Sequence, residues 1–370
     1  MKKELGLYVH IPFCRKKCAY CDFPSFAGRE SSMEAYVERL TAEMKERQDP
    51  DAVIATLYVG GGTPSLLPTG LMERILKELR GYFDFLPDAE CSCECNPGTV
   101  TEAFLRVLKK GGVNRLSFGA QARQDRLLRM LGRVHTWDQV RESAAMAHEQ
   151  GFDNLNFDLM LGLPGQTLPD VEESLLSALA LSPTHLSCYG LIVEEGTKMH
   201  AMVESGKWKL PDEETERDMY ELCRNILSRH GFSQYEISNF ALPGFSCRHN
   251  LDCWRRKEYI GLGSAACGFL NGVRYRNPPA LDDYLAGKPP EETVISPEDA
   301  RFESVMLGLR MTEGVSEEAF FRMHGVSLWD VYGERLKKSL SLGLVIRENG
   351  FVRLTRRGMD VQNRVLVDLL

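Results

Sequence analysis

Short apolar runs alternate with longer stretches of helical periodicity over the first 235 residues of the chain. The short runs are expected to form strands, at residues 5–10, 56–59, 90–95, 115–118, 154–159 and 185–189. The stretches between them predict helices at residues 33–47, 71–82, 101–109, 137–150 and 171–181. Glycine and proline mark the joins, as in the sequence Gly-Gly-Gly-Thr-Pro at residues 60–64.

This alternation predicts an α/β fold. Repeated strand–helix units form parallel sheets with right-handed crossovers. Six or so units indicate an open, partial (β/α)6 barrel, in which ligands gather at the carboxyl ends of the strands.

The pattern changes after residue 235. Residues 236–295 are rich in Gly, Pro, Asn and aromatic side chains and are interpreted as a connector. From residue 296 to 370, helical patterns at 297–309, 316–324 and 328–341 precede two short β-like runs, at 345–347 and 351–354. Asn349-Gly350 between these runs predicts a hairpin. We therefore expect a barrel over 1–235, a connector over 236–295 and a winged-helix-like domain over 296–370.

Charge and hydropathy exclude some classes of function. The net charge of −7 gives no general attraction to nucleic acid or anionic membranes. Residues 301–370 carry 11 Lys and Arg against 9 Asp and Glu, a net charge of +2, so we expect no binding of DNA by the last domain. The chain contains no run of 18 or more apolar residues, so no segment is expected to cross a bilayer. The apolar stretch before Cys14 is too short for a secretory signal. We expect a cytoplasmic protein without a transmembrane segment.

Cys14, Cys18 and Cys21 are the first candidates for chemistry among eleven cysteines. Disulfides are rare in reducing compartments, so clustered cytosolic cysteines favour metal binding. The three follow the first strand, where a βα loop is expected. Three thiolates hold three irons of a [4Fe–4S] cluster and leave the fourth iron open. A structural zinc site with a fourth ligand from elsewhere is the alternative.

The spacing C-x3-C-x2-C, preceded by Tyr8-Val-His-Ile-Pro-Phe, resembles the radical S-adenosylmethionine (SAM) superfamily. It is most similar to the branch that contains the oxygen-independent coproporphyrinogen III oxidase HemN and the heme chaperone HemW, and the resemblance covers nearly the whole chain. It implies that Cys14, Cys18 and Cys21 hold the cluster and that the amino and carboxylate groups of SAM chelate the open iron.

The same resemblance implies further SAM contacts. The matching residues are Tyr8, Tyr20, Gly61, Gly62, Thr63, Glu94, Gln121, Arg133 and Asp158. Taken alone, the residues also have ordinary explanations. The glycine loop fits a tight βα turn, Arg133 a surface cation and Asp158 a helix cap.

Cys91, Cys93 and Cys95 alternate along one predicted strand, so they share one face while Glu94 takes the other. A second metal site is one interpretation. Because free cysteine packs as a small apolar residue, we favour packing against the helical layer, with Glu94 pointing into the barrel.

Two motifs distinguish the branches. The oxidases carry another cysteine just beyond the triplet, whereas this chain reads Cys21-Asp22-Phe23. Residues 247–254 resemble the heme-associated H-N-x-x-Y-W motif of the chaperones, which implies His249 as a heme ligand. Cys253 replaces the motif's tyrosine, and Cys267 stands where relatives often have histidine. A Cys253 thiolate is an alternative ligand, and a purely structural hydrogen bond is an alternative role for His249.

Our first hypothesis is a heme chaperone that binds heme and transfers it to an unidentified acceptor protein, with a [4Fe–4S] cluster and exchangeable SAM. The alternative is a radical SAM enzyme acting on a porphyrinogen, which would need an electron donor to cleave SAM. A purely structural cluster protein is a third, weaker hypothesis.

Overall fold

Six parallel strands form the centre of the fold. The computed structural model describes residues 2–370. The central strands are β1 (Lys3–Ile11), β2 (Ala52–Gly61), β3 (Phe85–Cys95), β4 (Arg115–Gln121), β5 (Leu155–Leu161) and β6 (His185–Gly190). Each strand pairs in parallel with the next along the chain. The predicted partial barrel of six strands is confirmed.

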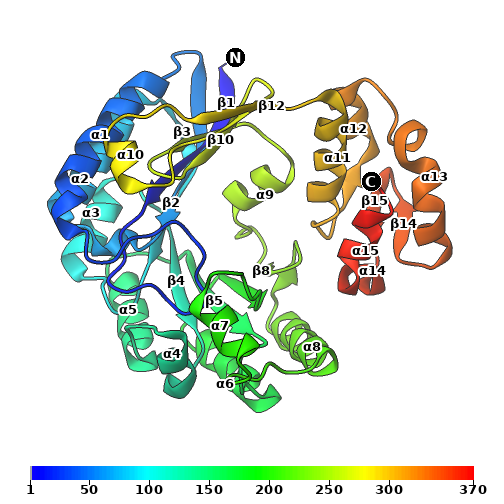
Figure 1. The fold of residues 1–370 in the computed structure, drawn as a ribbon, viewed down its shortest axis with the longest axis horizontal. Coiled ribbons are helices and arrows are strands. Elements are labelled where there is room, and N and C mark those ends of the chain that lie inside the picture. The colour runs from blue at the N-terminus through cyan, green and yellow to red at the C-terminus, as the bar shows by residue number, and fades with distance from the viewer. Residues whose placement is uncertain (1) are drawn as a thin grey trace.

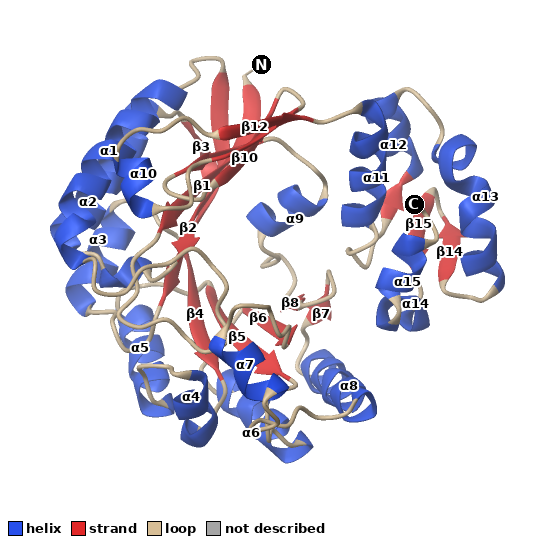
Figure 2. Ribbon diagram, viewed as in Figure 1, coloured by secondary structure: helices blue, strands red, loops and turns tan. Residues whose placement is uncertain are grey.

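Of the first eight helices, all but α7 cover the convex face of this curved sheet, and α7 lies in front of β5 and β6 (Figure 2). They are α1 (Met33–Arg47), α2 (Thr69–Tyr82), α3 (Glu102–Lys110), α4 (Asp125–Leu131), α5 (Trp137–Glu149), α6 (Leu168–Leu179), α7 (Lys198–Glu204) and α8 (Glu213–Arg229), with short 3-10 turns η1 (Glu30–Ser32) and η2 (Pro64–Leu66). One apolar core joins the sheet to α1, α2, α3, α5, α6 and α8 and includes Cys91, Cys93 and Cys95, whereas α4 and α7 belong to a separate apolar cluster. The predicted packing of these cysteines is confirmed.

Residues 236–295, expected as a connector, extend the sheet at both ends, together with β7 just before them. Within residues 2–370 the sheet has twelve strands in the order β12-β11-β10-β9-β1-β2-β3-β4-β5-β6-β8-β7. The added elements are β7 (Ser233–Gln234), β8 (Asn239–Ala241), α9 (Arg248–Trp254), β9 (Tyr259–Leu262), β10 (Cys267–Leu270), β11 (Val273–Arg276), α10 (Leu281–Leu285) and β12 (Glu291–Val294). The helix α9 lies in the hollow of the sheet (Figure 1).

The C-terminal domain has its own core and a three-stranded sheet. It comprises α11 (Pro297–Gly308), β13 (Val315–Ser316), α12 (Glu317–His324), α13 (Leu328–Ser341), β14 (Val345–Glu348), β15 (Phe351–Leu354), α14 (Arg356–Asp360) and α15 (Gln362–Val367). The hairpin turn places Asn349 at φ 51° and Gly350 at φ 78°, the positive angles that an Asn-Gly turn favours. The predicted three helices and hairpin are present, and β13, α14 and α15 are additional.

No helix in the described part of the chain, residues 2–370, is both long and apolar enough to span a bilayer.

Candidate cluster and cofactor site

The concave face of the barrel is polar. Leu5, Leu7 and Val9 of β1 belong to the core beneath the outer helices, so the alternate residues of the strands face inward. The polar side chains on this inner face are Tyr8, His10, Thr56, Tyr58, Glu90, Ser92, Glu94, Arg115, Ser117, Asn156, Asp158, His185 and Ser187. Strands covered on both faces are usually apolar throughout, so a polar inner face indicates a binding cavity rather than packing alone.

Cys14, Cys18 and Cys21 lie in the loop that follows β1, and all three are free thiols with partial exposure. The amide of Cys14 donates to the carbonyl oxygen of Phe26 (3.0 Å) and closes the loop on itself, and the amide of Ala19 donates to Leu131 (2.8 Å) and attaches the loop to the end of α4. Burial, together with the nearby sulfurs of Cys18 and Cys14, raises the pKa of Cys21. The three sulfurs therefore share one local environment.

The donors around these sulfurs suit an anionic cluster. Thr63 Oγ1 lies 3.6 Å from the sulfur of Cys14, and Arg133 Nη1 lies 3.5 Å from that of Cys18. The Nε of Arg133 is buried without a hydrogen-bond partner, which leaves a cationic donor available. Among residues 2–370, no three His, Cys, Asp or Glu side chains converge closely enough to hold one metal ion. The guanidinium and the hydroxyl beside the sulfurs fit a cluster held by negatively charged thiolates.

The glycine loop at the end of β2 packs tightly against the protein itself. A Cβ on Gly60 would lie 2.9 Å from the Glu94 carboxyl, and one on Gly61 would lie 2.5 Å from the ring of His10. A Cβ on Gly62 would lie 2.8 Å from the carbonyl oxygen of Phe13. Gly61 also has φ +109°, which side-chain-bearing residues rarely adopt. These glycines therefore bring the β2 loop beside the cysteine loop.

Glu94 points into the barrel, as the alternation predicted. Its carboxylate accepts hydrogen bonds from the Tyr58 hydroxyl (3.0 Å) and the Gly61 amide (3.1 Å). Burial raises the pKa of Glu94 to about 7, and the negative charge of Asp158 adds to this rise. The site therefore holds a carboxyl group that an incoming cation would stabilise in its charged form.

Other predicted contacts lie around the same space. Arg133 donates to the carbonyl oxygen of Gly119 (2.9 Å), and its positive charge lies near the hydroxyl of the partly buried Tyr20. Asp158 accepts from Ser117 (3.2 Å), and burial raises its pKa. Gln121 is buried at φ +66°, a left-handed conformation that is uncommon without glycine and is often found at functional sites.

His10 and Tyr58 are residues that the sequence analysis missed. His10 lies 2.9 Å from both the Tyr8 hydroxyl and the carbonyl oxygen of Pro24, so it links β1 to the cysteine loop. Tyr58 donates to Glu94 through its hydroxyl and stacks on the rings of Tyr8 and His249. The strand alternation that placed Glu94 inward applies equally to these residues and could have identified them.

His249 is separated from the cysteine loop. It lies on α9, and its Nδ1 is 2.9 Å from Thr56 Oγ1 on β2. Its ring stacks on Tyr58 with centroids 5.3 Å apart. Only 6% of His249 is exposed, and burial lowers its pKa to about 4, so the imidazole is neutral at physiological pH. In this conformation His249 is not accessible to a planar ligand.

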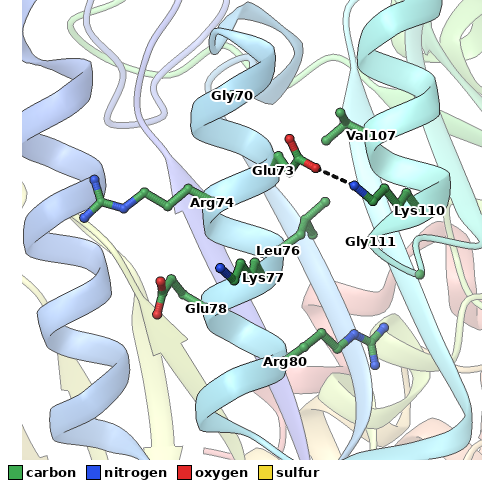
Figure 3. A pocket seen from close by; sticks show the side chains of 11 residues that line it. Gly70, Glu73, Arg74, Leu76, Lys77, Glu78, Arg80, Val107, Lys110 and Gly111 are labelled. Carbon is green, nitrogen blue, oxygen red and sulfur yellow. Dashed lines mark hydrogen bonds and ion pairs between the residues drawn. The ribbon is translucent and has the colours of Figure 1, made fainter.

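A surface groove lies elsewhere, away from the cysteine loop. It has a volume of about 940 Å³ and lies between α2 and α3 on the outside of the barrel (Figure 3). Charged side chains line it, and Lys110 and Glu73 form an ion pair across it at 2.8 Å. Nothing in this groove resembles the cysteine site.

The open parallel barrel and the cysteine loop define a radical SAM protein. Residues 8–178 match the Radical SAM superfamily and residues 295–361 match the HemN C-terminal domain. Coproporphyrinogen III oxidase (HemN) from Escherichia coli has the same fold, with a TM-score of 0.86 at 23% identity over 100% of this chain and 90% of that chain. The superfamily implies a [4Fe–4S] cluster and SAM as cofactors.

The relatives place the chain more narrowly. It is 37% identical over 369 residues to the heme chaperone HemW of Bacillus subtilis, covering 97% of both chains. It is 35% identical to HemW of Lactococcus lactis (100% of this chain, 98% of the relative) and 33% identical to HemW of E. coli (98% and 97%). The chain belongs to the HemW family.

Proposed function

We propose that this protein is a heme chaperone, which binds heme and delivers it to an acceptor protein. The observation that supports this most strongly is the full-length similarity to proteins named heme chaperone HemW, from the cysteine loop to the C-terminal domain. The absence of a further cysteine in Cys21-Asp22-Phe23 distinguishes the chain from the oxidase pattern.

In this proposal Cys14, Cys18 and Cys21 hold the [4Fe–4S] cluster. The glycine loop with Thr63, together with Tyr8, Tyr20, Glu94, Gln121, Arg133 and Asp158, forms the SAM site. Arg133 offers positive charge beside the sulfur of Cys18, and Glu94 offers a carboxylate for the SAM amino group. The cluster, when bound, would supply an electron-transfer centre. The residues around it would orient SAM and exclude water.

His249 is the proposed axial ligand of heme. Its lowered pKa favours the neutral imidazole that coordinates iron. Burial raises the pKa of Cys253 to about 12, so that thiol stays protonated and is the weaker candidate. The buried position of His249 means that α9 must move before coordination.

The partners and compartment are part of the same proposal. All eleven cysteines are free thiols, which suits a reducing cytoplasm. Heme and an acceptor protein are the required partners, and an electron donor is required only where SAM is cleaved. We assign no nucleic-acid partner.

The test is an absorption-monitored heme titration of the anaerobically reconstituted protein. We expect a saturable Soret shift near one heme per chain, weakened about tenfold or more in His249→Ala because an axial ligand is lost. His230→Ala is the matched control, since His230 bonds only within its own helix end, to Ile226. No saturable shift in the wild type would contradict the proposal and favour assays of SAM cleavage with coproporphyrinogen.

A further inference from the structure

A continuous chain of contacts joins His249 to the SAM side of the barrel. The His249 ring stacks on Tyr58, and the Tyr58 hydroxyl donates to Glu94. The other oxygen of Glu94 accepts from the amide of Gly61 in the glycine loop. Tyr58 therefore contacts both sites, because its ring packs on His249 and its hydroxyl positions Glu94.

His249 reaches Tyr58 only because α9 is held in the hollow of the sheet. The Glu90 carboxylate on β3 accepts from the backbone amides of Arg248 (2.9 Å) and His249 (3.0 Å) at the start of α9. At the far end, Arg310 of the C-terminal domain lies over the Trp254 ring at 4.5 Å. The helix thus has one end on the barrel and the other under the C-terminal domain.

The closed position of α9 is incompatible with iron coordination by His249. The side chain is only 6% exposed, which leaves no room for a macrocycle against its ring. The hydrogen bond of its Nδ1 to Thr56 orients the ring and leaves Nε2 as the coordinating nitrogen. A planar macrocycle needs open space on the coordinating nitrogen, so the start of α9 must leave β2 and β3. When His249 leaves, Tyr58 loses the nearer of the two rings stacked on it and keeps only Tyr8, at 6.5 Å, so its hydroxyl is held less firmly against Glu94.

We propose that α9 is a latch that couples the two ligand sites in opposite senses through Tyr58. With the latch closed, Tyr58 positions Glu94 and SAM is retained. With the latch open, His249 is presented to heme and SAM is held less tightly. This inference rests on the proposed function, since it names the regulation of the same heme and SAM sites. Tyr58 is a positioning residue in it.

Linkage makes the proposal measurable, because a coupling between two ligands is reciprocal. SAM affinity of the reconstituted protein would be measured by equilibrium dialysis, with and without saturating heme. We expect heme to weaken SAM binding roughly fivefold or more, and SAM to weaken heme binding by the same factor. In heme-free protein, His249→Ala should weaken SAM binding several-fold, although His249 lies outside the SAM site.

Tyr58→Phe tests the route, because it keeps the ring that packs on His249 and removes the hydroxyl. We expect the coupling factor to fall below about twofold. Tyr220→Phe is the matched control: it removes a partly buried hydroxyl that donates to the Ile237 carbonyl oxygen (2.6 Å), and it should leave the coupling intact. Hydrogen exchange of residues 247–255 gives a second readout, which SAM should slow in the wild type but not in Tyr58→Phe.

The outcomes separate the latch from the proposed function. Heme binding with SAM affinity unchanged within twofold would overturn the latch and leave the chaperone proposal standing. Full coupling in Tyr58→Phe would overturn the route through Tyr58. Absence of heme binding by the wild type would overturn both.

Discussion

At the scale of single residues, Glu94 is a carboxyl group in a place where ionisation is costly. Two donors, the Tyr58 hydroxyl and the Gly61 amide, support its charged form. Desolvation and the charge of Asp158 outweigh them and raise its pKa from 4.5 to about 7. The folded protein therefore keeps a proton on Glu94 at pH values where the unfolded chain has released it.

This difference predicts a pH-dependent stability. Between about pH 4.5 and 7 the folded state binds more protons than the unfolded state, so the free energy of unfolding falls as pH rises through this window. The contribution of Glu94 is at most about 3 kcal/mol. Urea denaturation of the metal-free protein at pH 5 and pH 8 should show a smaller loss in Glu94→Gln than in the wild type. Equal losses in the two proteins would contradict the raised pKa.

The inward position of Glu94 could be predicted from strand alternation, whereas its pKa could not. The pKa depends on Asp158, which is 64 positions further along the chain and on another strand, β5. Arg115 shows the same limit. It is almost fully buried with its Nε unpaired, near Glu90 and Cys247, and no local pattern marks it as different from a surface arginine.

At the scale of elements, α9 receives its N-terminal cap from a distant strand. Cys247 at the N-cap position makes no side-chain capping bond, and Glu90 of β3 accepts from the first amides instead. A carboxylate at this end also interacts favourably with the helix dipole. The helix therefore depends on tertiary structure, since seven residues are too few to be stable alone.

Glu90→Gln should loosen this helix. The neutral amide removes the negative charge near the helix start and near the buried Arg115, at a cost of about 1–3 kcal/mol. We expect faster hydrogen exchange at residues 248–254, with the rest of the barrel little changed. Asp212→Asn is the control, because Asp212 caps the separate helix α8 through the amide of Thr215. Exchange at 248–254 that matches the wild type would contradict a capping role for Glu90.

The elements predicted correctly are those whose own sequence period determines them. The six central strands and helices such as α1 and α5 carry clear patterns over many residues. The strands β7 to β12 are two to four residues long, and their pairing depends on neighbours already in place. β9, for example, forms because β1 offers it a free edge in parallel register.

At the scale of the whole molecule, charged pairs attach the C-terminal domain to the barrel. Arg310 donates to Glu236 at 2.7 Å, and Arg256 donates to Glu303 at 2.8 Å. Glu236 is fully buried. Arg310 and Glu236 are 74 positions apart, so the sequence gives no sign that these two charges meet. The net charge of the last domain is small, so it does not indicate that individual charged residues such as Arg310 and Glu303 bind the barrel side of the molecule.

Arg310→Met should therefore be among the most destabilising substitutions of a partly exposed residue. It leaves the Glu236 carboxylate buried without its partner, which costs about 3 kcal/mol, and it removes the cation over Trp254. Arg356→Met breaks a more exposed pair with Glu221 and should cost less than about 1 kcal/mol. Urea denaturation with fluorescence detection measures both.

The double variant Arg310→Met with Glu236→Gln identifies the physical cause. Removing the second charge abolishes the uncompensated carboxylate, so part of the lost stability should return. The rate of proteolysis between the barrel and the C-terminal domain should follow the same order, fastest in Arg310→Met. If the double variant is as unstable as the two single losses added together, the charges act independently. The C-terminal domain is then held by packing rather than by this pair, and α9 has no charged anchor at its Trp254 end.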